Sequence, residues 1–338
     1  MRALVVHGPG DARVDEVEDP LAAVGQVVVD VERVGICGTD VEFYTGEMAY
    51  LRQGHASYPL RIGHEWVGRV TALGDGADPS WLGKRVTGDT MLGCGNCERC
   101  RRGRHHICEF RHEIGIRGGW PGALAEQLVV PVSALYQIPE SVSLAAAAMV
   151  EPGAGAVRSV NAASLEPGRR LLIYGPGTIG LLAAQFALAR GVEVHVVGIE
   201  NTSLELARSV GVHGAYLDAE DLPSTFDAVI DATNDAGIPA ASLRWVEPGG
   251  RVILVGLSGE PSLLDSRQIT LGDVTVVGIL GGSAGIGEAI AAYTDGRVVP
   301  DALVSEVISL EEVASRLEGE RGASAGIGPK VHVDPRVV

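Results

Sequence analysis

Four of the five cysteines in this chain lie within one short stretch, CGNCERCRRGRHHIC. Their spacing is Cys94-x2-Cys97-x2-Cys100-x7-Cys108. Two-residue gaps let thiolates from one looping segment converge on a single ion, and four thiolates close a tetrahedral zinc shell with no open position for water or substrate. The basic residues between them offset the negative charge of such a shell. The stretch therefore predicts a structural zinc site that stabilises a loop and does not catalyse.

Two other chemistries use closely spaced cysteines. Some ferredoxin sequences also begin with two-residue gaps, but here no proline follows Cys108 and the sequence has no second cysteine cluster. A disulfide framework fits poorly because the number of cysteines is odd. It also fits poorly with the reducing cytoplasm, which is where we expect this protein. Zinc is the favoured interpretation.

The fifth cysteine predicts a second metal site. Cys37 lies in GICGTD, His64 and Glu65 lie in GHE, and Glu151 lies in VEPGAG. A mixed shell of thiolate, imidazole and carboxylate can keep or exchange one position for water or substrate, as a catalytic zinc requires. Each residue alone has an ordinary alternative, namely a buried cysteine, a core histidine or a helix cap. Their combination with the cysteine stretch predicts a catalytic metal site.

The motif GPGTIG, at residues 175–180, predicts a dinucleotide site because it follows a predicted strand and opens a predicted helix. The first glycine permits the tight turn, the second lets the backbone approach the pyrophosphate, and the third packs the helix on the strand. Free N–H groups at the helix start face the phosphates. We assign cofactor contacts to Gly175, Gly177, Thr178, Ile179 and Gly180.

Glu200 indicates which nicotinamide cofactor is bound. It lies twenty residues after Gly180, at the end of the next predicted strand. A carboxylate there accepts hydrogen bonds from the adenosine ribose and repels a 2′-phosphate. The next arginine is Arg208. These residues favour NAD over NADP.

The pattern of elements changes along the chain. Up to about residue 150, short apolar strands are broken by glycine and proline, which indicates β-rich, mostly antiparallel structure. From about residue 165, strands alternate with helices, as in 169–175, 178–190 and 192–199, which predicts a parallel sheet wound on both faces. Further helices are predicted at 203–211 and 238–250.

Size and composition exclude several classes. The 338 residues are more than one core usually supports, so two domains are expected. The net charge of -16 argues against nucleic acid as a partner. The start of the sequence does not read as a secretory signal, and no apolar stretch reaches the length of a membrane helix. We expect a cytoplasmic enzyme with a small-molecule substrate.

Together these motifs resemble those of the zinc-containing medium-chain dehydrogenase/reductase superfamily, which includes the alcohol, polyol, glucose and threonine dehydrogenases. The resemblance covers nearly the whole chain, because GICGTD, GHE, the four-cysteine lobe, EP and GPGTIG occur in family order. It implies a GroES-like catalytic domain at 1–152, with a structural-zinc lobe at about 90–112. It further implies a Rossmann NAD-binding domain at 153–285 and a return to the catalytic domain at 286–338, with the active site between the domains.

The resemblance also implies roles for individual residues. Cys37, His64, Glu65 and Glu151 would hold catalytic zinc, with the two carboxylates exchanging with water, so the chain would carry two zinc ions. Thr39 would receive the alcohol proton through its hydroxyl. A glutamate at position 151 looks more like the sorbitol, threonine and sugar dehydrogenases than the alcohol dehydrogenases.

Three further residues complete the predicted site. Asp40 is a candidate to orient a histidine ligand through its other ring nitrogen. Glu42 stands where many relatives have a relay histidine and glucose dehydrogenases have glutamate, so it either relays the proton or binds a polyhydroxylated substrate. Trp120, with His55 and Arg117, is a candidate for the pocket wall.

These observations predict an NAD-dependent oxidoreductase acting on a secondary alcohol of a polyol, sugar or amino alcohol. An NADPH-dependent aldehyde or ketone reductase would use the same parts in reverse. A third hypothesis is a non-catalytic binding or structural protein. The intact metal ligands argue against it. The resemblance implies a homodimer or homotetramer. The sequence does not select the substrate, because one methylene or hydroxyl changes the preference of a pocket.

Overall fold

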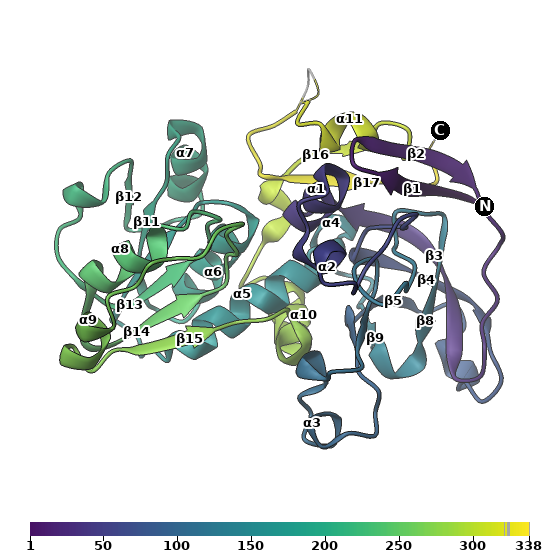
Figure 1. Cartoon of the computed structure of the whole chain (residues 1–338), viewed down its shortest axis with the longest axis horizontal. Coiled ribbons are helices and arrows are strands. Elements are labelled where there is room, and N and C mark those ends of the chain that lie inside the picture. Colours follow the sequence, from purple (N-terminus) through teal and green to yellow (C-terminus); the bar gives the residue numbers. More distant parts are fainter. Residues whose placement is uncertain (321, 323–324, 338) are drawn as a thin grey trace. The chain divides into compact units, whose positions relative to one another are not determined.

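The computed structural model describes residues 1–320, 322 and 325–337, and the chain divides into two compact units (Figure 1). Unit 1 comprises Met1–Glu151, Val304–Gly326 and Lys330–Val338. Unit 2 comprises Pro152–Leu303 and Ile327–Pro329. The boundary falls within one helix, α5 (Val150–Ala163), directly after Glu151.

Unit 1 is β-rich. Its strands are β1 (Arg2–Gly8), β2 (Asp11–Glu16), β3 (Gln26–Gly35), β4 (Glu65–Leu73), β5 (Arg85–Gly88), β6 (Met91–Leu92), β7 (His112–Glu113), β8 (Gln127–Pro131), β9 (Leu135–Gln137), β16 (Val304–Ile308) and β17 (Lys330–Val333). Its helices are α1 (Gly38–Thr45), α2 (Ala49–Arg52), α3 (Glu98–Arg101), α4 (Leu144–Ala148) and α11 (Val313–Leu317).

The main sheet of unit 1 has seven strands in the order β16-β17-β3-β4-β5-β9, with β8 also paired to β3. Its pairs are antiparallel except β16 with β17. The apolar residues of β3 and β4 enter one core around the fully buried Trp66 and Phe43, because strands of this pattern bury a face against their neighbours. This sheet carries the segments that contain Cys37 and His64.

Unit 2 is an α/β unit. Its strands are β10 (Arg170–Tyr174), β11 (Glu193–Val197), β12 (Gly214–Tyr216), β13 (Phe226–Asp231), β14 (Val246–Leu254) and β15 (Thr275–Gly278). With α5, its helices are α6 (Thr178–Leu188), α7 (Asn201–Ser209), α8 (Ile238–Trp245), α9 (Ser266–Leu271) and α10 (Ile286–Thr294).

The sheet of unit 2 is parallel throughout, in the order β12-β11-β10-β13-β14-β15. The strand order reverses beside β10, and the carboxyl end of a strand at such a switch point is where ligands bind in doubly wound folds. The motif GPGTIG begins at that end. The predicted fold class, a GroES-like β-rich domain with a Rossmann domain, is therefore confirmed.

Three predicted helices end earlier in the structure than expected, and the one predicted at 203–211 ends at Ser209. The helix predicted at 238–250 ends at Trp245, because residues from Val246 onward enter β14 and pair with β13. The apolar helix predicted at 178–190 ends at Leu188, before the turn that contains Gly191 at a φ of +75°.

The end of unit 2 also differs from the expected boundary at residue 285. Helix α10 belongs to unit 2 because it packs on α6 and its surroundings. Tyr293 stacks on Phe186 with ring centroids 6.2 Å apart, and Glu288 forms an ion pair with Arg190 at 2.7 Å. The chain re-enters unit 1 only at Val304.

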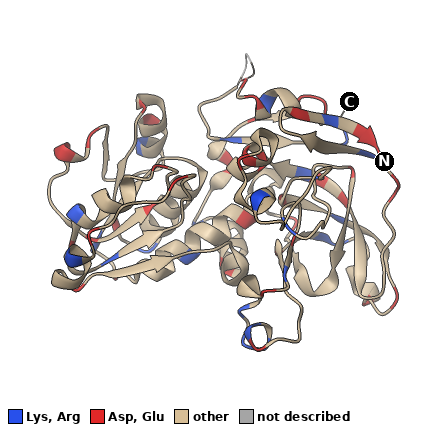
Figure 2. Ribbon diagram, in the orientation of Figure 1, with Lys and Arg blue, Asp and Glu red and all other residues tan. Residues whose placement is uncertain are grey.

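Acidic side chains are distributed over both units, whereas several basic ones gather around α3 (Figure 2). Among the described residues, no helix combines the length and apolar character needed to cross a lipid bilayer.

Candidate functional site

The four clustered cysteines converge in unit 1. Their sulfur atoms all lie within 4.8 Å of one another, and all five cysteines of the chain are free. Cys97 begins α3 and its sulfur accepts the Cys100 N–H at 3.4 Å, and a 3₁₀ turn at His105–Ile107 returns the chain to Cys108. Four converging thiols fit the shell of one zinc ion and leave no position for a substrate.

The remaining cysteine lies in a second cluster in the same unit. Donor atoms of Cys37, His64 and Glu65 lie within 4.8 Å of one another, and His64 and Glu65 are buried. His64 Nδ1 is buried without a hydrogen-bond partner. A thiol, an imidazole and a carboxylate in contact, with a polar atom left unpaired, fit the donor set of a catalytic zinc.

Asp40 joins the two segments that carry these donors. Its Oδ2 accepts the Cys37 N–H at 2.9 Å and its Oδ1 accepts the Gly63 N–H at 3.1 Å. The distance from Oδ1 to His64 Nδ1 is 3.9 Å, longer than a hydrogen bond. Asp40 thus fixes the backbone of both segments, whereas the sequence suggested that it bonds the histidine ring.

Gly63 is required by close packing at this point. Its φ is +97°, and a Cβ there would lie 2.7 Å from the backbone nitrogen of Leu124. Only glycine adopts this conformation without strain and leaves that space free. The tight passage places His64 next to the segment that begins with Cys37.

Glu65 is held by a residue that sequence reasoning missed. Lys330 Nζ donates to Glu65 Oε1 at 2.9 Å, to Glu65 Oε2 at 2.7 Å and to the carbonyl oxygen of Ile36 at 2.8 Å. Both side chains are almost fully buried, and a Cβ on Gly35 would clash with Glu65 Oε2. The sequence signal for this contact was a lysine at the first position of β17, in which apolar and polar residues alternate.

Glu151 lies outside the group of three but influences it. Burial raises the pKa of Glu151 to about 7, although the charge of His64 opposes this shift. Burial opposes the charged form of His64, but the Cys37 sulfur, Asp40 and Glu151 outweigh it and raise the pKa of His64. Burial also raises the pKa of Asp40. The cluster is therefore a buried, electrostatically coupled set.

Two predicted residues on α1 have free polar groups. Thr39 and Glu42 are both partly buried, and neither side chain has a hydrogen-bond or ion-pair partner among the described residues. Burial, with a smaller effect of Glu47, raises the pKa of Glu42. Both side chains remain available to a ligand.

Trp120 has a different environment from the one expected. Its indole N–H donates to the carbonyl oxygen of Val129 on β8 at 3.1 Å, and its ring is tilted against His112. The polar atom of the side chain is thus used within unit 1. His55 and Arg117 instead flank the ring of Tyr50, each at 5.6 Å.

The glycine motif has the geometry of a phosphate-binding turn in unit 2. Gly175 has a φ of +92°, and a Cβ on Gly180 would clash with the Gly175 carbonyl oxygen. A Cβ on Gly177, in contrast, would meet no atom within 4 Å. The space beside Gly177 is therefore open, and Thr178 and Ile179 follow it as the first residues of α6, whose N-terminus suits a pyrophosphate.

Glu200 is exposed directly before α7. The ring of Pro176 packs on Gly198, where a Cβ would lie 2.5 Å from the Pro176 Cγ. This contact brings the end of β11 against the glycine turn. Arg208 is turned away, since its guanidinium donates to the carbonyl oxygen of Ala215 at 3.0 Å.

Comparisons with known proteins show the family to which the chain belongs. Residues 23–140 match the alcohol dehydrogenase GroES-like domain, and residues 178–295 match the zinc-binding dehydrogenase domain. An L-threonine 3-dehydrogenase from Idiomarina loihiensis is 31% identical over 296 residues, which cover 83% of this chain and 84% of that protein.

Two solved structures are similar over 99% of this chain and 99% of their own. One, described as the short chain alcohol dehydrogenase rspB from Escherichia coli CFT073 with NADH, has 26% identity and a TM-score of 0.90. The other, a zinc-binding dehydrogenase from Sinorhizobium meliloti 1021 bound to NADP, has 28% identity and a TM-score of 0.89. The chain thus belongs to the zinc-containing medium-chain dehydrogenase/reductase superfamily, and it is an oxidoreductase of that family.

Proposed function

We propose that this protein oxidises a secondary alcohol with NAD at the site of Cys37, His64 and Glu65. The observation that carries the proposal is the convergence of these three donors, of which His64 and Glu65 are buried and Cys37 is partly exposed. A zinc ion held there supplies Lewis acidity that lowers the pKa of an alcohol oxygen. The four cysteines of the lobe would hold a second, structural zinc.

The chain's own residues supply the other functions. The Thr39 hydroxyl, which has no other side-chain partner among the described residues, takes the alcohol proton as a relay and passes its own hydroxyl proton on to water. Lys330 holds the Glu65 carboxylate, and Asp40 fixes the segments of Cys37 and His64. Glu151, whose pKa is near neutrality, is a further carboxylate ligand that exchanges with water.

NAD is the proposed cofactor because Glu200 is exposed beside the glycine turn and Arg208 is engaged elsewhere. The test is Glu200→Ser, with Glu205→Gln, an exposed acid on α7, as the matched control. Losing charge-assisted bonds to the ribose should lower kcat/KM for NAD about tenfold or more and raise it for NADP. Equal use of both cofactors by the unaltered enzyme would contradict the assignment.

The proposed substrate is a secondary alcohol that carries further polar groups, as in amino alcohols, polyols and sugars. Similarity to L-threonine 3-dehydrogenases supports the amino-alcohol class. The half-buried Glu42 carboxylate, which lacks a partner among the described residues, supports recognition of a hydroxyl or ammonium group. Glu42→Gln should raise KM for such substrates and leave simple alcohols unchanged.

The deciding experiment tests a panel of amino alcohols, polyols, sugars and simple alcohols as substrates. Its readout is the reduction of the nicotinamide, measured with NAD and with NADP. Metal analysis accompanies it, with two zinc ions per chain expected. NADPH-dependent carbonyl reduction without alcohol oxidation would favour the reductase alternative. Zinc in the lobe alone, with no turnover, would favour a non-catalytic protein.

We also propose that the protein is a homodimer in the cytoplasm. Strand β15 is the edge of the parallel sheet, and its Thr275, Val276 and Gly278 are exposed. An exposed apolar edge is a template for pairing with another strand, and a two-fold axis lets β15 pair with its own copy. Exposed leucines near it in sequence, Leu263 and Leu271, add apolar surface. The five free thiols suit a reducing compartment.

A further inference from the structure

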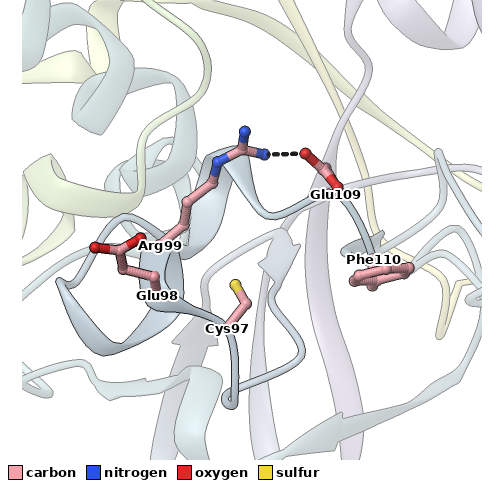
Figure 3. A pocket seen from close by; sticks show the side chains of 5 residues that line it. All are labelled: Cys97, Glu98, Arg99, Glu109 and Phe110. Carbon is pink, nitrogen blue, oxygen red and sulfur yellow. Dashed lines mark ion pairs between the residues drawn. The ribbon is translucent and has the colours of Figure 1, made fainter.

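Three cysteines of the lobe, Cys94, Cys97 and Cys100, are partly exposed, whereas Cys108 is buried. Cys97 lines a recess of about 200 Å³ together with Glu98, Arg99, Glu109 and Phe110 (Figure 3). The other three cysteines do not line it. A small molecule in solution therefore meets the sulfur of Cys97 from this recess.

Cys94 and Cys100 are partly exposed, as Cys97 is, but neither lines the recess. Cys108 is fully buried. Cys100 is closely packed, since a Cβ on Gly93 would lie 2.8 Å from the Cys100 sulfur and 2.7 Å from the Cβ of His105. Cys94 accepts the backbone N–H groups of Asn96 and Cys97.

The recess is held open by polar contacts in its wall. Arg99 Nη1 donates to the carbonyl oxygen of Ile107 at 3.0 Å and forms an ion pair with Glu109 Oε1 at 3.0 Å. Both partners are tied down, so the long Arg99 side chain does not fold over Cys97. Phe110 is 72% exposed at the same recess. An ion pair and an exposed phenyl ring thus form part of the wall of the recess.

We propose that Cys97 is an oxidation site for small hydroperoxides and that Cys108 completes a disulfide with it. The two sulfurs are 3.7 Å apart. A disulfide requires about 2.05 Å, so the bond forms only if the sulfurs leave their positions around a shared ion. The modification therefore disassembles the structural metal shell.

The chemistry balances with the hydroperoxide as the only oxidant. The Cys97 thiolate attacks the terminal oxygen, an S–O bond forms, the O–O bond breaks, and the hydroperoxide is reduced to an alcohol or water. The sulfur becomes a sulfenic acid. The Cys108 thiol then attacks the Cys97 sulfur, an S–S bond forms, the S–O bond breaks, and the hydroxide that leaves takes the thiol proton of Cys108 and departs as water.

Loss of the metal shell would affect residues outside the lobe, because polar contacts connect the lobe to the rest of unit 1. His105 Nε2 pairs with the buried Asp89 Oδ2 at 2.6 Å. Arg111 donates to Glu113 at 2.7 Å and to the Tyr50 hydroxyl at 3.1 Å. Tyr50 lies on α2, outside the lobe.

The test uses the zinc-loaded, full-length protein treated with hydrogen peroxide. A sulfenic-acid trapping reagent such as dimedone should label Cys97 first, as read by peptide mass spectrometry. Without the trap, a Cys97–Cys108 disulfide should appear together with the loss of one zinc ion per chain to a chromophoric chelator. These readouts do not depend on turnover, so they remain decisive if the proposed dehydrogenase activity fails.

Two matched variants report on access to the recess. Phe110→Ala removes an exposed side chain from the recess and should speed Cys97 labelling about twofold or more, because thiol oxidation follows exposure. Arg104→Ala changes an exposed lobe residue that does not line the recess and should leave the rate unchanged. First labelling at Cys94 or Cys100, or zinc loss without the Cys97–Cys108 disulfide, would overturn the proposal.

Discussion

At the scale of single residues, the contact between Lys330 and Glu65 is the least expected feature of the site. A lysine and a glutamate, both almost fully buried, share two hydrogen bonds. Burial lowers the pKa of Lys330, but the charge of Glu65 outweighs that effect and raises it. The Glu65 carboxylate beside the candidate metal is therefore held in a fixed position by its cationic partner.

We predict that Lys330→Met destabilises the protein by about 3–5 kcal/mol, because it leaves the Glu65 carboxylate buried without its counter-charge. The free energy of unfolding in urea measures the change. The matched control is Arg102→Ala, which breaks an exposed pair with Glu98 and should cost less than about 1 kcal/mol. Comparable losses in the two variants would show that Lys330 contributes no more than a surface charge.

At the scale of elements, the turn between β10 and α6 separates a structural glycine from a ligand-binding one. Gly180 packs on the Gly175 carbonyl, whereas a Cβ on Gly177 would contact nothing. Gly177 also has a φ of −85°, which other residues adopt. The two glycines of one motif therefore serve different purposes.

We predict opposite phenotypes for alanine at these positions. Gly180→Ala should lower stability by about 1–3 kcal/mol through overpacking. Gly177→Ala should leave the melting temperature unchanged and weaken NAD binding about tenfold, because its methyl group enters the space for the pyrophosphate. Calorimetric melting and NAD titration separate the two effects. Unchanged NAD affinity in Gly177→Ala would contradict the assigned site.

Strand β17 carries a second buried titratable group, His332, which pairs with Gly35 of β3. Both of its ring nitrogens are buried without a hydrogen-bond partner. Burial, together with the charges of Lys330 and Arg33, lowers the pKa of His332 to about 3. The folded protein therefore keeps this ring neutral.

This burial makes stability depend on pH in a defined window. Between about pH 6.5 and the folded-state pKa of about 3, the unfolded chain binds a proton that the folded chain does not. The contribution of His332 to the free energy of unfolding is therefore fully present above this window. Within the window it decreases as the pH is lowered, by up to about 1.4 kcal/mol per pH unit. His332→Leu should show a shallower loss of unfolding free energy between pH 6.5 and 5. His112→Gln, an exposed histidine, is the control, and identical profiles for wild type and His332→Leu would refute the prediction.

At the scale of the whole molecule, the two sheets each end in an exposed strand. Val276 on β15 is 36% exposed and Val307 on β16 is 49% exposed. Of these two strands, only β15 belongs to a sheet whose strands are all parallel. Several leucines near β15 in the sequence are also exposed. This difference favours β15 as the edge that meets a second copy.

We predict that Val276→Lys converts the dimer to a monomer, because a charge on an edge strand opposes pairing. Val307→Lys places the same charge on the other exposed edge and should leave the mass unchanged. Sedimentation equilibrium gives the mass of each variant. A dimer that persists in Val276→Lys would exclude this edge as the interface.

Local patterns determined much of this protein from the sequence alone. The cysteine spacing, the glycine turn and the alternation of strands and helices are short-range features, because their residues are close along the chain and their geometry follows from turn and helix rules. The convergence of the four thiols and the turn at Gly175 needed no knowledge of distant contacts. The fold class followed from the same patterns.

Contacts between distant segments were decided only by the tertiary structure. Lys330 and Glu65 are 265 residues apart, and they meet because β17 pairs with β3, a pairing that no local spacing encodes. The bond from the Gly63 N–H to Asp40, which joins residues 23 positions apart, has the same origin, and so does the place of α10 in unit 2. The hydrogen-bond partner of a buried polar side chain depends on the register and packing of strands from different parts of the chain. The sequence carries no local signal for that partner.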